Sequence, residues 1–324
     1  MGQIALTTDD KRVWKPLAPP PDISGYGIYV GTSGYYFDDW IGLFNPPRVA
    51  GKQRMGLSDE ERADQDRLRF YQKYFSFVEI NNTFYQEPLI ESFIDIERRS
   101  KESMKYAVKV NRNISHTKNW DVESGKELMR KHITAVSPLI ETGRFYSFLI
   151  QLEDHVARSL EVLDYLLAVA SEAVSRKIDV HIEFRHNSWH GMHPLQSLKD
   201  NGIGICNTEI PPLKHAFPLK SYATTDKGYV RYSGRNLQNW YPKDRQTTSK
   251  ERIEARNARY DYLYSEEEIR EKAKGQIALT RKVSSIAVAY NNHYQIKAVI
   301  NAIQNIQQLK LRLLQLNHKE GEGR

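Results

Sequence analysis

Two short apolar segments each carry a glutamate with polar residues two positions away. Glu79 and Asn81 lie in the segment VEINN, and Glu183 lies between His181 and Arg185 in HIEFR. Side chains two residues apart in an extended strand point to the same face, so these polar groups share one face and their apolar neighbours share the other. A carboxylate that points inward from a strand is costly unless a cation pairs with it.

The expected partner of Glu79 is a base on a neighbouring strand. Lys109, in KYAVKV, is the first candidate, and His181 and Arg185 are the others. A carboxylate beside a cation can carry out acid–base chemistry or help to clamp a phosphate, and a purely structural ion pair is the alternative. We therefore predict Glu79, Lys109 and Glu183 as the catalytic candidates.

Polar groups at other strand ends are candidates for ligand binding. Arg231 and Arg235 flank a turn that contains glycine, an arrangement that suits bidentate contact with a phosphate or carboxylate. The segment GTSG offers the hydroxyls of Thr32 and Ser33 to an anion, although a plain tight turn has the same composition. The other candidates are polar or aromatic residues close to strand ends: Asn81, Tyr85, His116, Gln151, Arg185, Trp189, Asn291 and Asn292. For the asparagine pair, a turn that caps the next helix is the alternative.

The sequence offers little support for a metal or a reactive thiol. His181 and Glu183 have the spacing of metal ligands on a strand, but no other compact cluster of His, Asp and Glu completes a coordination shell. We assign no metal ligand and leave the cofactor unknown, with a divalent metal as an alternative. The one cysteine, Cys206, lies in an apolar strand, which predicts a buried, inert thiol.

Short apolar runs that alternate with helical patterns must position these side chains. Eight runs have the length and composition of strands: 28–32, 76–82, 105–111, 146–152, 179–184, 202–207, 229–232 and 285–291. Helical spacing occurs at 154–176 and 294–316, with shorter candidates at 66–75, 91–100, 126–139 and 194–201. This alternation predicts an α/β protein of the (β/α)8 TIM-barrel type, in which functional side chains gather at the carboxyl ends of the strands. An open doubly wound sheet is the alternative, but no G-x-G-x-x-G motif follows the first strand.

The predicted barrel is a single domain with additions. Charged segments with few core residues look inserted near 48–69 and 241–275, and the hexamer GQIALT occurs at 2–7 and again at 275–280. One short match of this kind does not indicate a repeat architecture. The expected parts are a Pro-rich arm at 1–25, the barrel at 26–316 and a flexible tail at 317–324.

Composition and charge exclude several classes of protein. Of the 324 residues, 40% are apolar and 27% are charged, which is typical of a globular chain. No run approaches the ~18 apolar residues of a membrane span, and the N-terminus lacks the apolar core of a signal peptide. With the single cysteine, these features predict a cytoplasmic protein with no membrane partner.

The net charge of +7 is concentrated in one segment. Residues 220–260 hold ten basic and four acidic side chains, interleaved with six aromatic ones. Such a segment can bind phosphates or nucleic acid, and an ordinary solvated surface is the alternative.

Seven segments between about residues 28 and 305 contain most of the residues singled out above. They read GTSGYYFDDW, VEINNTFYQEP, YAVKVNRNISH, FLIQL, HIEFRHNSW, VRYSGRN and AYNNHYQIKAVINA. Together and in this order they resemble the YecE-like family, also called domain of unknown function 72. The resemblance implies a TIM-type barrel whose activity is unsettled. Tyr35, Ser233 and the pair Asn207-Thr208 depart from the family pattern, which has Trp, His and Asp at those places. The loss of a His and an Asp weakens an acid–base or metal mechanism.

Three functions agree with these observations, and whether the protein is an enzyme stays open among them. The first is binding of a phosphorylated small molecule or nucleic acid at the carboxyl-end face, with phosphodiester hydrolysis as its catalytic form. The second is a sugar-isomerase-like or lyase-type enzyme, in which Glu79 and Glu183 move protons while Gln151, Asn291 and Asn292 bind hydroxyl groups. The third is a non-catalytic binding protein.

Overall fold

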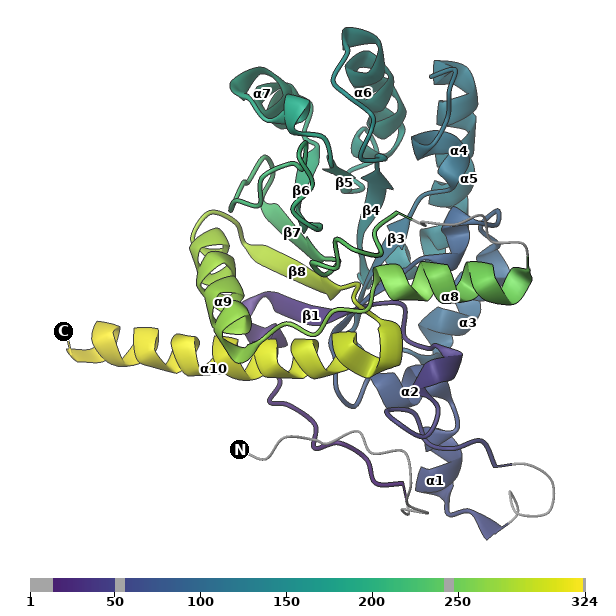
Figure 1. Cartoon of the computed structure of the whole chain (residues 1–324), viewed down its shortest axis with the longest axis vertical. Coiled ribbons are helices and arrows are strands. Elements are labelled where there is room, and N and C mark those ends of the chain that lie inside the picture. The colour runs from purple at the N-terminus through teal and green to yellow at the C-terminus, as the bar shows by residue number, and fades with distance from the viewer. Residues whose placement is uncertain (1–13, 50–55, 242–247, 323–324) are drawn as a thin grey trace.

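Eight parallel strands close into a barrel in the computed structural model of the chain (Figure 1). The structure describes residues 14–49, 56–241 and 248–322. The strands pair in chain order, and β1 pairs with both β2 and β8. This confirms the predicted α/β fold of the (β/α)8 TIM-barrel type. The strands are β1 (Ile28–Ser33), β2 (Phe77–Ile80), β3 (Lys105–Lys109), β4 (Phe145–Gln151), β5 (Val180–Glu183), β6 (Gly204–Glu209), β7 (Lys227–Tyr232) and β8 (Ser285–Tyr290).

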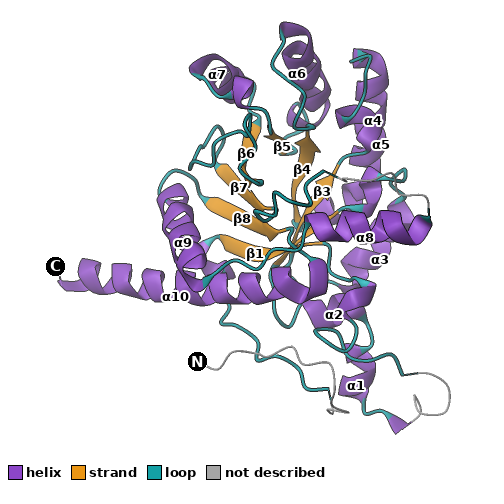
Figure 2. Ribbon diagram, in the orientation of Figure 1, coloured by secondary structure: helices purple, strands orange, loops and turns teal. Residues whose placement is uncertain are grey.

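Helices surround the strands on the outside of the barrel (Figure 2). The described helices are α1 (Asp59–Asp64), α2 (Arg67–Tyr71), α3 (Ile90–Arg99), α4 (Arg112–Ser115), α5 (Val122–Glu141), α6 (Leu160–Val174), α7 (Met192–Asp200), α8 (Ser249–Arg259), α9 (Glu266–Thr280) and α10 (Lys297–Glu322). None of them is long and apolar enough to cross a membrane.

Capping residues explain where several helices begin. The spacing at 154–176 predicted a helix from residue 154, but α6 begins at Leu160. The Ser159 side chain accepts a hydrogen bond from the Val162 amide and caps the helix there. Ser265 and Glu268 form a capping box at the start of α9. At the other end of the chain, α10 continues to Glu322 and extends away from the barrel (Figure 1), so the flexible tail expected from residue 317 onward is helical through residue 322.

The two charged segments that looked inserted have different places in the fold. The segment near 48–69 lies between β1 and β2 and contains α1 and the start of α2. The segment near 241–275 contains α8 and the first ten residues of α9, and both helices lie between β7 and β8. Residues 210–226, all of which the structure describes, connect β6 to β7 without a helix.

The Pro-rich arm is irregular over its described part, as its composition predicts. The Trp14 ring packs 6.0 Å from the Phe70 ring, centroid to centroid, and the Tyr74 hydroxyl donates to the Leu17 carbonyl at 2.9 Å. These contacts hold the arm against α2 and the turn that follows it. The first GQIALT copy lies outside the described residues, and the second lies in α9.

Inward side chains fill the barrel in layers. Near the amino ends of the strands, His181 binds the Ser147 hydroxyl at 2.6 Å and the Lys227 carbonyl at 2.9 Å. The next layer is apolar and includes Phe77, Leu149 and Cys206. Because inward positions recur every second residue, the layer above it contains the polar residues near the carboxyl ends.

Cys206 is expected to be unreactive in the folded protein. It lies in the apolar layer without exposure to solvent, and burial raises the pKa of its thiol well above the ordinary value. Titration with a disulfide reagent at pH 8 should give no reaction under native conditions and one thiol per chain in denaturant. Rapid native labelling would show that the barrel interior opens to solvent.

Candidate functional site

Every strand delivers one polar side chain to the carboxyl end of the barrel. Strand register aligns Ser33 with Glu79, and it aligns Gln151 with Glu183 and Thr208 with Arg231. The carboxyl-end layer consists of Ser33, Glu79, Lys109, Gln151, Glu183, Thr208, Arg231 and Asn291, all of them buried. The inward orientation predicted for Glu79 and Glu183 is therefore observed.

Arg231 joins the two glutamates. Its Nε and Nη2 donate to the two carboxylate oxygens of Glu79 at 2.9 and 3.0 Å, and its Nη1 donates to Glu183 Oε2 at 3.2 Å. The Tyr229 hydroxyl donates to Glu79 Oε2 at 2.6 Å. The expectation that a neighbouring strand supplies the partner of Glu79 was wrong, because β7 lies across the barrel from β2. His181 lies near the amino ends of the strands and does not reach this glutamate.

Both glutamates stay ionised in this network. Burial raises the pKa of each carboxyl, but the nearby guanidinium groups outweigh burial and hold both pKa values below their usual range. Arg231 dominates this opposing effect at Glu79, and Arg185 does so at Glu183, where its Nε donates to Oε1 at 2.7 Å. Ion-paired carboxylates of this kind are poor proton acceptors near neutral pH.

Lys109 has a different environment, although it lies in the same layer. Its Nζ donates to Gln151 Oε1 at 2.9 Å and lies 3.7 Å from the centre of the Phe84 ring. Burial, followed by repulsion from Arg231 and Arg185, lowers the pKa of this amine to about 7. The Lys109 amine therefore loses its proton far more readily than an ordinary lysine.

The loop after β7 folds over one side of this layer. The Trp240 indole is buried, and its Nε1 donates to Asp154 Oδ2 at 2.9 Å, as the Tyr241 hydroxyl does at 2.6 Å. The Arg185 guanidinium carbon lies 5.6 Å from the centre of the Trp240 ring. Arg185 Nη2 is buried without a hydrogen-bond partner in the described structure. The loop thus excludes water from the arginine beside Glu183.

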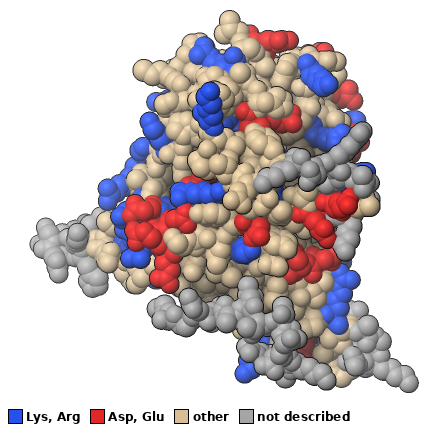
Figure 3. Space-filling view, viewed as in Figure 1, with Lys and Arg blue, Asp and Glu red and all other residues tan. Residues whose placement is uncertain are grey.

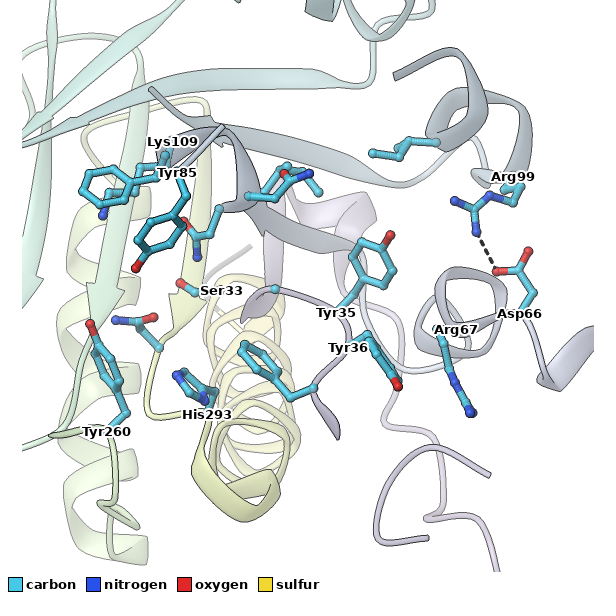
Figure 4. Close-up of a pocket in the computed structure, with 18 of the residues that line it drawn as sticks. Ser33, Tyr35, Tyr36, Asp66, Arg67, Tyr85, Arg99, Lys109, Tyr260 and His293 are labelled. Atoms are coloured by element: carbon cyan, nitrogen blue, oxygen red, sulfur yellow. Dashed lines mark hydrogen bonds and ion pairs between the residues drawn. The ribbon is translucent and has the colours of Figure 1, made fainter. Parts of the chain in front are cut away.

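A cavity of about 770 Å³ opens above the carboxyl-end layer (Figure 4). Ser33, Asn81, Lys109, Arg231 and Asn291 form part of its lining and come from the predicted set, together with the half-exposed Tyr85. The buried Ser33 hydroxyl and the Asn81 carbonyl oxygen have no hydrogen-bond partner among the described residues. Both are buried, unsatisfied side-chain atoms of residues that line the cavity.

The far end of the cavity is cationic. Figure 4 shows Lys109 and Tyr85 at one end and Arg67, Arg99 and Asp66 at the other. Arg99 is neutralised by Asp66 at 3.0 Å and by Asp95 at 2.6 Å. In the part of the chain that the structure describes, Arg67 has no carboxylate within ion-pair distance; its Nη1 donates to the Pro46 carbonyl at 2.9 Å. Arg67 is thus a half-buried guanidinium at the cavity wall with its charge uncompensated.

Several residues predicted to bind ligand lie elsewhere. The Thr32 hydroxyl faces outward and donates to the Gly34 carbonyl at 2.6 Å, and buried Trp189 stacks on Phe184 with 4.4 Å between ring centres. Asn292 donates to the Tyr262 carbonyl and to Asn301 Oδ1, so it bonds to the connection between α8 and α9 and to α10 and is not part of the cavity lining.

His116 and Arg235 also lie outside the lining of this cavity. His116 packs edge-on against Phe84, and burial, together with the charges of Lys109 and Arg185, lowers the pKa of its imidazole to about 3. Arg235 pairs with Glu209 at 2.7 Å and with Glu268 at 2.6 Å, beside a smaller cavity against α9.

The walls of the cavity contain residues that the sequence interpretation missed. Tyr35, Tyr36 and Phe37 follow β1, Arg67 comes from the segment near 48–69, and Tyr260 ends α8. The run of three aromatic residues directly after GTSG could have indicated a binding surface there. Nothing in the sequence marked Arg67 among its charged neighbours.

Three described basic residues of the segment at 220–260 do not contribute to a cationic rim. Arg231 is buried, Arg235 is paired, and Lys227 pairs with Asp179 at 2.7 Å near the amino end of the barrel. Lys243 and Arg245 lie outside the described residues. On the face shown in Figure 3, basic and acidic side chains are interspersed.

The arrangement offers no evident place for a metal ion. No group of three or more His, Cys, Asp or Glu side chains within the described ranges is arranged to hold one. Both oxygens of Glu79 and both of Glu183 already accept hydrogen bonds from arginines. The donor set therefore does not fit a divalent cation.

Known proteins with the same architecture match most of the chain. A DUF72 family protein of Thermotoga maritima MSB8, solved as a crystal structure, is 29% identical, with a TM-score of 0.70, covering 87% of this chain and 99% of that one. A DUF72 family protein of Enterococcus faecalis V583 is 22% identical, with a TM-score of 0.71, covering 87% of this chain and 95% of that one.

A curated relative and the family model give the same assignment. The UPF0759 protein YunF of Bacillus subtilis is 22% identical over 292 residues, which cover 88% of this chain and 95% of that protein. The family described as "Protein of unknown function DUF72" matches residues 29–322. The chain therefore belongs to this DUF72 family, for which YecE-like is another name.

Proposed function

We propose that the cavity at the carboxyl end of the barrel binds a small phosphate-bearing metabolite, with the phosphate at Arg67 and the remainder of the molecule directed toward Lys109. The observation that carries the proposal is the uncompensated guanidinium of Arg67 at one end of a cavity whose other end holds Lys109. A half-buried arginine without a carboxylate is a strong site for an anion, because its donors match phosphate geometry.

The size and lining of the cavity support a small ligand. About 770 Å³ lies within the range of ordinary metabolite sites, roughly 300–1,000 Å³. Tyr35 and Tyr36 lie between the two ends (Figure 4) and supply apolar surface with hydroxyl groups. The partnerless Ser33 hydroxyl and Asn81 carbonyl oxygen would bind hydroxyl or carbonyl groups of the ligand.

The same contacts make the alternatives weaker. Nucleic-acid binding relied on the charge of residues 220–260, yet Arg231, Arg235 and Lys227 are paired with carboxylates. Proton transfer by Glu79 and Glu183 requires carboxyls that exchange protons near neutral pH, and both pKa values lie below the usual range. We therefore assign the catalytic candidacy to Lys109.

Replacement of Arg67 by glutamine should weaken binding of glycerol 3-phosphate at least tenfold, because a charge-assisted hydrogen bond contributes about 1.5–3 kcal/mol. Isothermal titration calorimetry checks the result, with glycerol as the uncharged comparison. Arg69→Gln is the matched control, since Arg69 is exposed on the same helix and outside the cavity lining.

A different pattern would overturn the proposal. In that pattern, glycerol 3-phosphate and other small sugar phosphates fail to bind, and a single-stranded oligonucleotide binds with a steep salt dependence. If Arg67→Gln also leaves the oligonucleotide binding unchanged, nucleic acid is the ligand.

A further inference from the structure

We infer that Lys109 forms an imine with a carbonyl group of the ligand, which makes the substrate class small phosphorylated aldehydes and ketones. This inference rests on the proposed function for the position of the phosphate and goes beyond it by naming the reacting group. Among the described residues, Lys109 is the one amine of the carboxyl-end layer, and Cys206 is buried in the apolar layer below.

The geometry around Lys109 suits an amine that reacts. Lys109 lines the cavity and is 8% exposed, so it faces the cavity while bulk water has little access to it. The hydrogen bond to Gln151 Oε1 and the Phe84 ring fix the position of Nζ. No carboxylate among the described residues lies within ion-pair distance of Nζ, because Arg231 and Arg185 take up both glutamates.

The electrostatics explain why this lysine is activated. Arg231 and Arg185 lie close enough to disfavour a third positive charge, and a lysine beside other cations in a desolvated site is a recognised form of activated nucleophile. Lys105 shares the strand but lies at its amino end, where Nζ donates to the Gly143 carbonyl. The same strand therefore provides a control lysine outside the cavity.

The covalent step is balanced without an external oxidant or reductant. Neutral Nζ attacks the carbonyl carbon, and a carbon–nitrogen bond forms as the carbonyl π electrons move to oxygen. The nitrogen gives up two protons in total, and the carbonyl oxygen leaves with them as one water molecule. The product is a C=N bond. When it is protonated, Glu79 and Glu183 favour its positive charge, and Arg231 and Arg185 oppose it, as they do at the free amine.

Reductive trapping tests the inference. Wild-type protein is incubated with dihydroxyacetone phosphate and sodium cyanoborohydride, and the modified lysine is located by peptide mass spectrometry. We expect one adduct per chain, on Lys109. We also expect its formation rate to rise through about pH 7, whereas surface lysines react faster only as pH approaches their ordinary pKa of about 10.4. Lys109→Arg should lose the adduct, and Lys105→Arg should retain it.

Two outcomes separate this inference from the proposed function. If dihydroxyacetone phosphate binds in an Arg67-dependent manner but no reduced adduct forms on Lys109, the imine is overturned and phosphate binding stands. If neutral glycolaldehyde is trapped on Lys109 while dihydroxyacetone phosphate neither binds nor reacts faster, phosphate binding is overturned and the imine stands. Labelling spread evenly over exposed lysines in wild-type protein contradicts the inference without use of any variant.

Discussion

Replacement of Arg231 by methionine should destabilise the protein by about 3–5 kcal/mol at pH 7.5, because removal of this partner leaves the buried Glu79 carboxylate uncompensated. Arg231 donates to both Glu79 and Glu183, and the glutamate side chains have no exposed surface. Urea unfolding followed by circular dichroism measures the loss. Arg235→Met is the control, since Arg235 is 41% exposed and its ion pairs should contribute about 1 kcal/mol or less.

The effect of Arg231→Met should shrink as pH falls. In the folded wild type, the pKa values of Glu79 and Glu183 lie below their ordinary range. The ionised carboxylates therefore contribute stability above the pKa of the unfolded chain, and this stability is lost as pH falls through the pKa values of the folded protein. In the variant, Glu79 lacks its main cation while Glu183 keeps Arg185, so the pKa of Glu79 should rise and acid should relieve the penalty. The difference in unfolding free energy between wild type and Arg231→Met should therefore decrease from pH 7.5 through pH 5.5 to pH 4.5. Equal losses in Arg231→Met and Arg235→Met, or a constant difference over this range, would contradict the network.

The content of the carboxyl-end layer was largely predictable from the sequence. Alternation with period two placed Glu79, Lys109 and Glu183 inward once their strands were recognised, and Arg231 follows the same rule. Parallel strands in a closed barrel bring such positions to one end, so the set followed from local patterns and the number of strands.

The pairing within that layer was not predictable in the same way. Sequence order indicates which strands are neighbours, and this suggested Lys109 on β3 as the first partner for Glu79. The observed partner comes from β7, because side chains of an eight-stranded barrel meet across its interior. The length of the arginine side chain, not adjacency of strands, decides this contact.

The cavity wall depends on loops whose packing local patterns do not encode. Arg67 and Tyr260 come from segments with charged, irregular composition, and only tertiary contacts bring them to the cavity. Trp189 and Asn292 were predicted to bind ligand but do not line the cavity. Each is close to a strand end, yet a stacking partner for Trp189 and a loop carbonyl for Asn292 hold them away from the cavity.

Replacement of Gly31 by alanine should cost about 3 kcal/mol of unfolding free energy, at the upper end of the usual range for overpacking. A Cβ atom there would lie 1.8 Å from the Phe77 carbonyl oxygen and 2.6 Å from the Tyr71 hydroxyl. Neither group can yield easily: the carbonyl belongs to the backbone of β2, and the Tyr71 hydroxyl donates to that carbonyl while it accepts from the Thr32 amide. Gly25→Ala is the matched control, because no atom lies within 4 Å of its added Cβ.

Gly31→Ala should weaken ligand binding at the candidate site as well as lower the unfolding free energy. Gly31 brings the backbone of β1 close to β2, and this approach goes with the register that puts Ser33 beside Glu79. If alanine at position 31 forces β1 outward, Ser33 moves away from the cavity, and glycerol 3-phosphate should bind more weakly even where the variant remains folded. Denaturant unfolding and calorimetry on Gly31→Ala and Gly25→Ala separate the two effects. Losses of unfolding free energy and of binding that are the same in both variants would mean that β1 accommodates alanine at position 31, and would contradict the prediction.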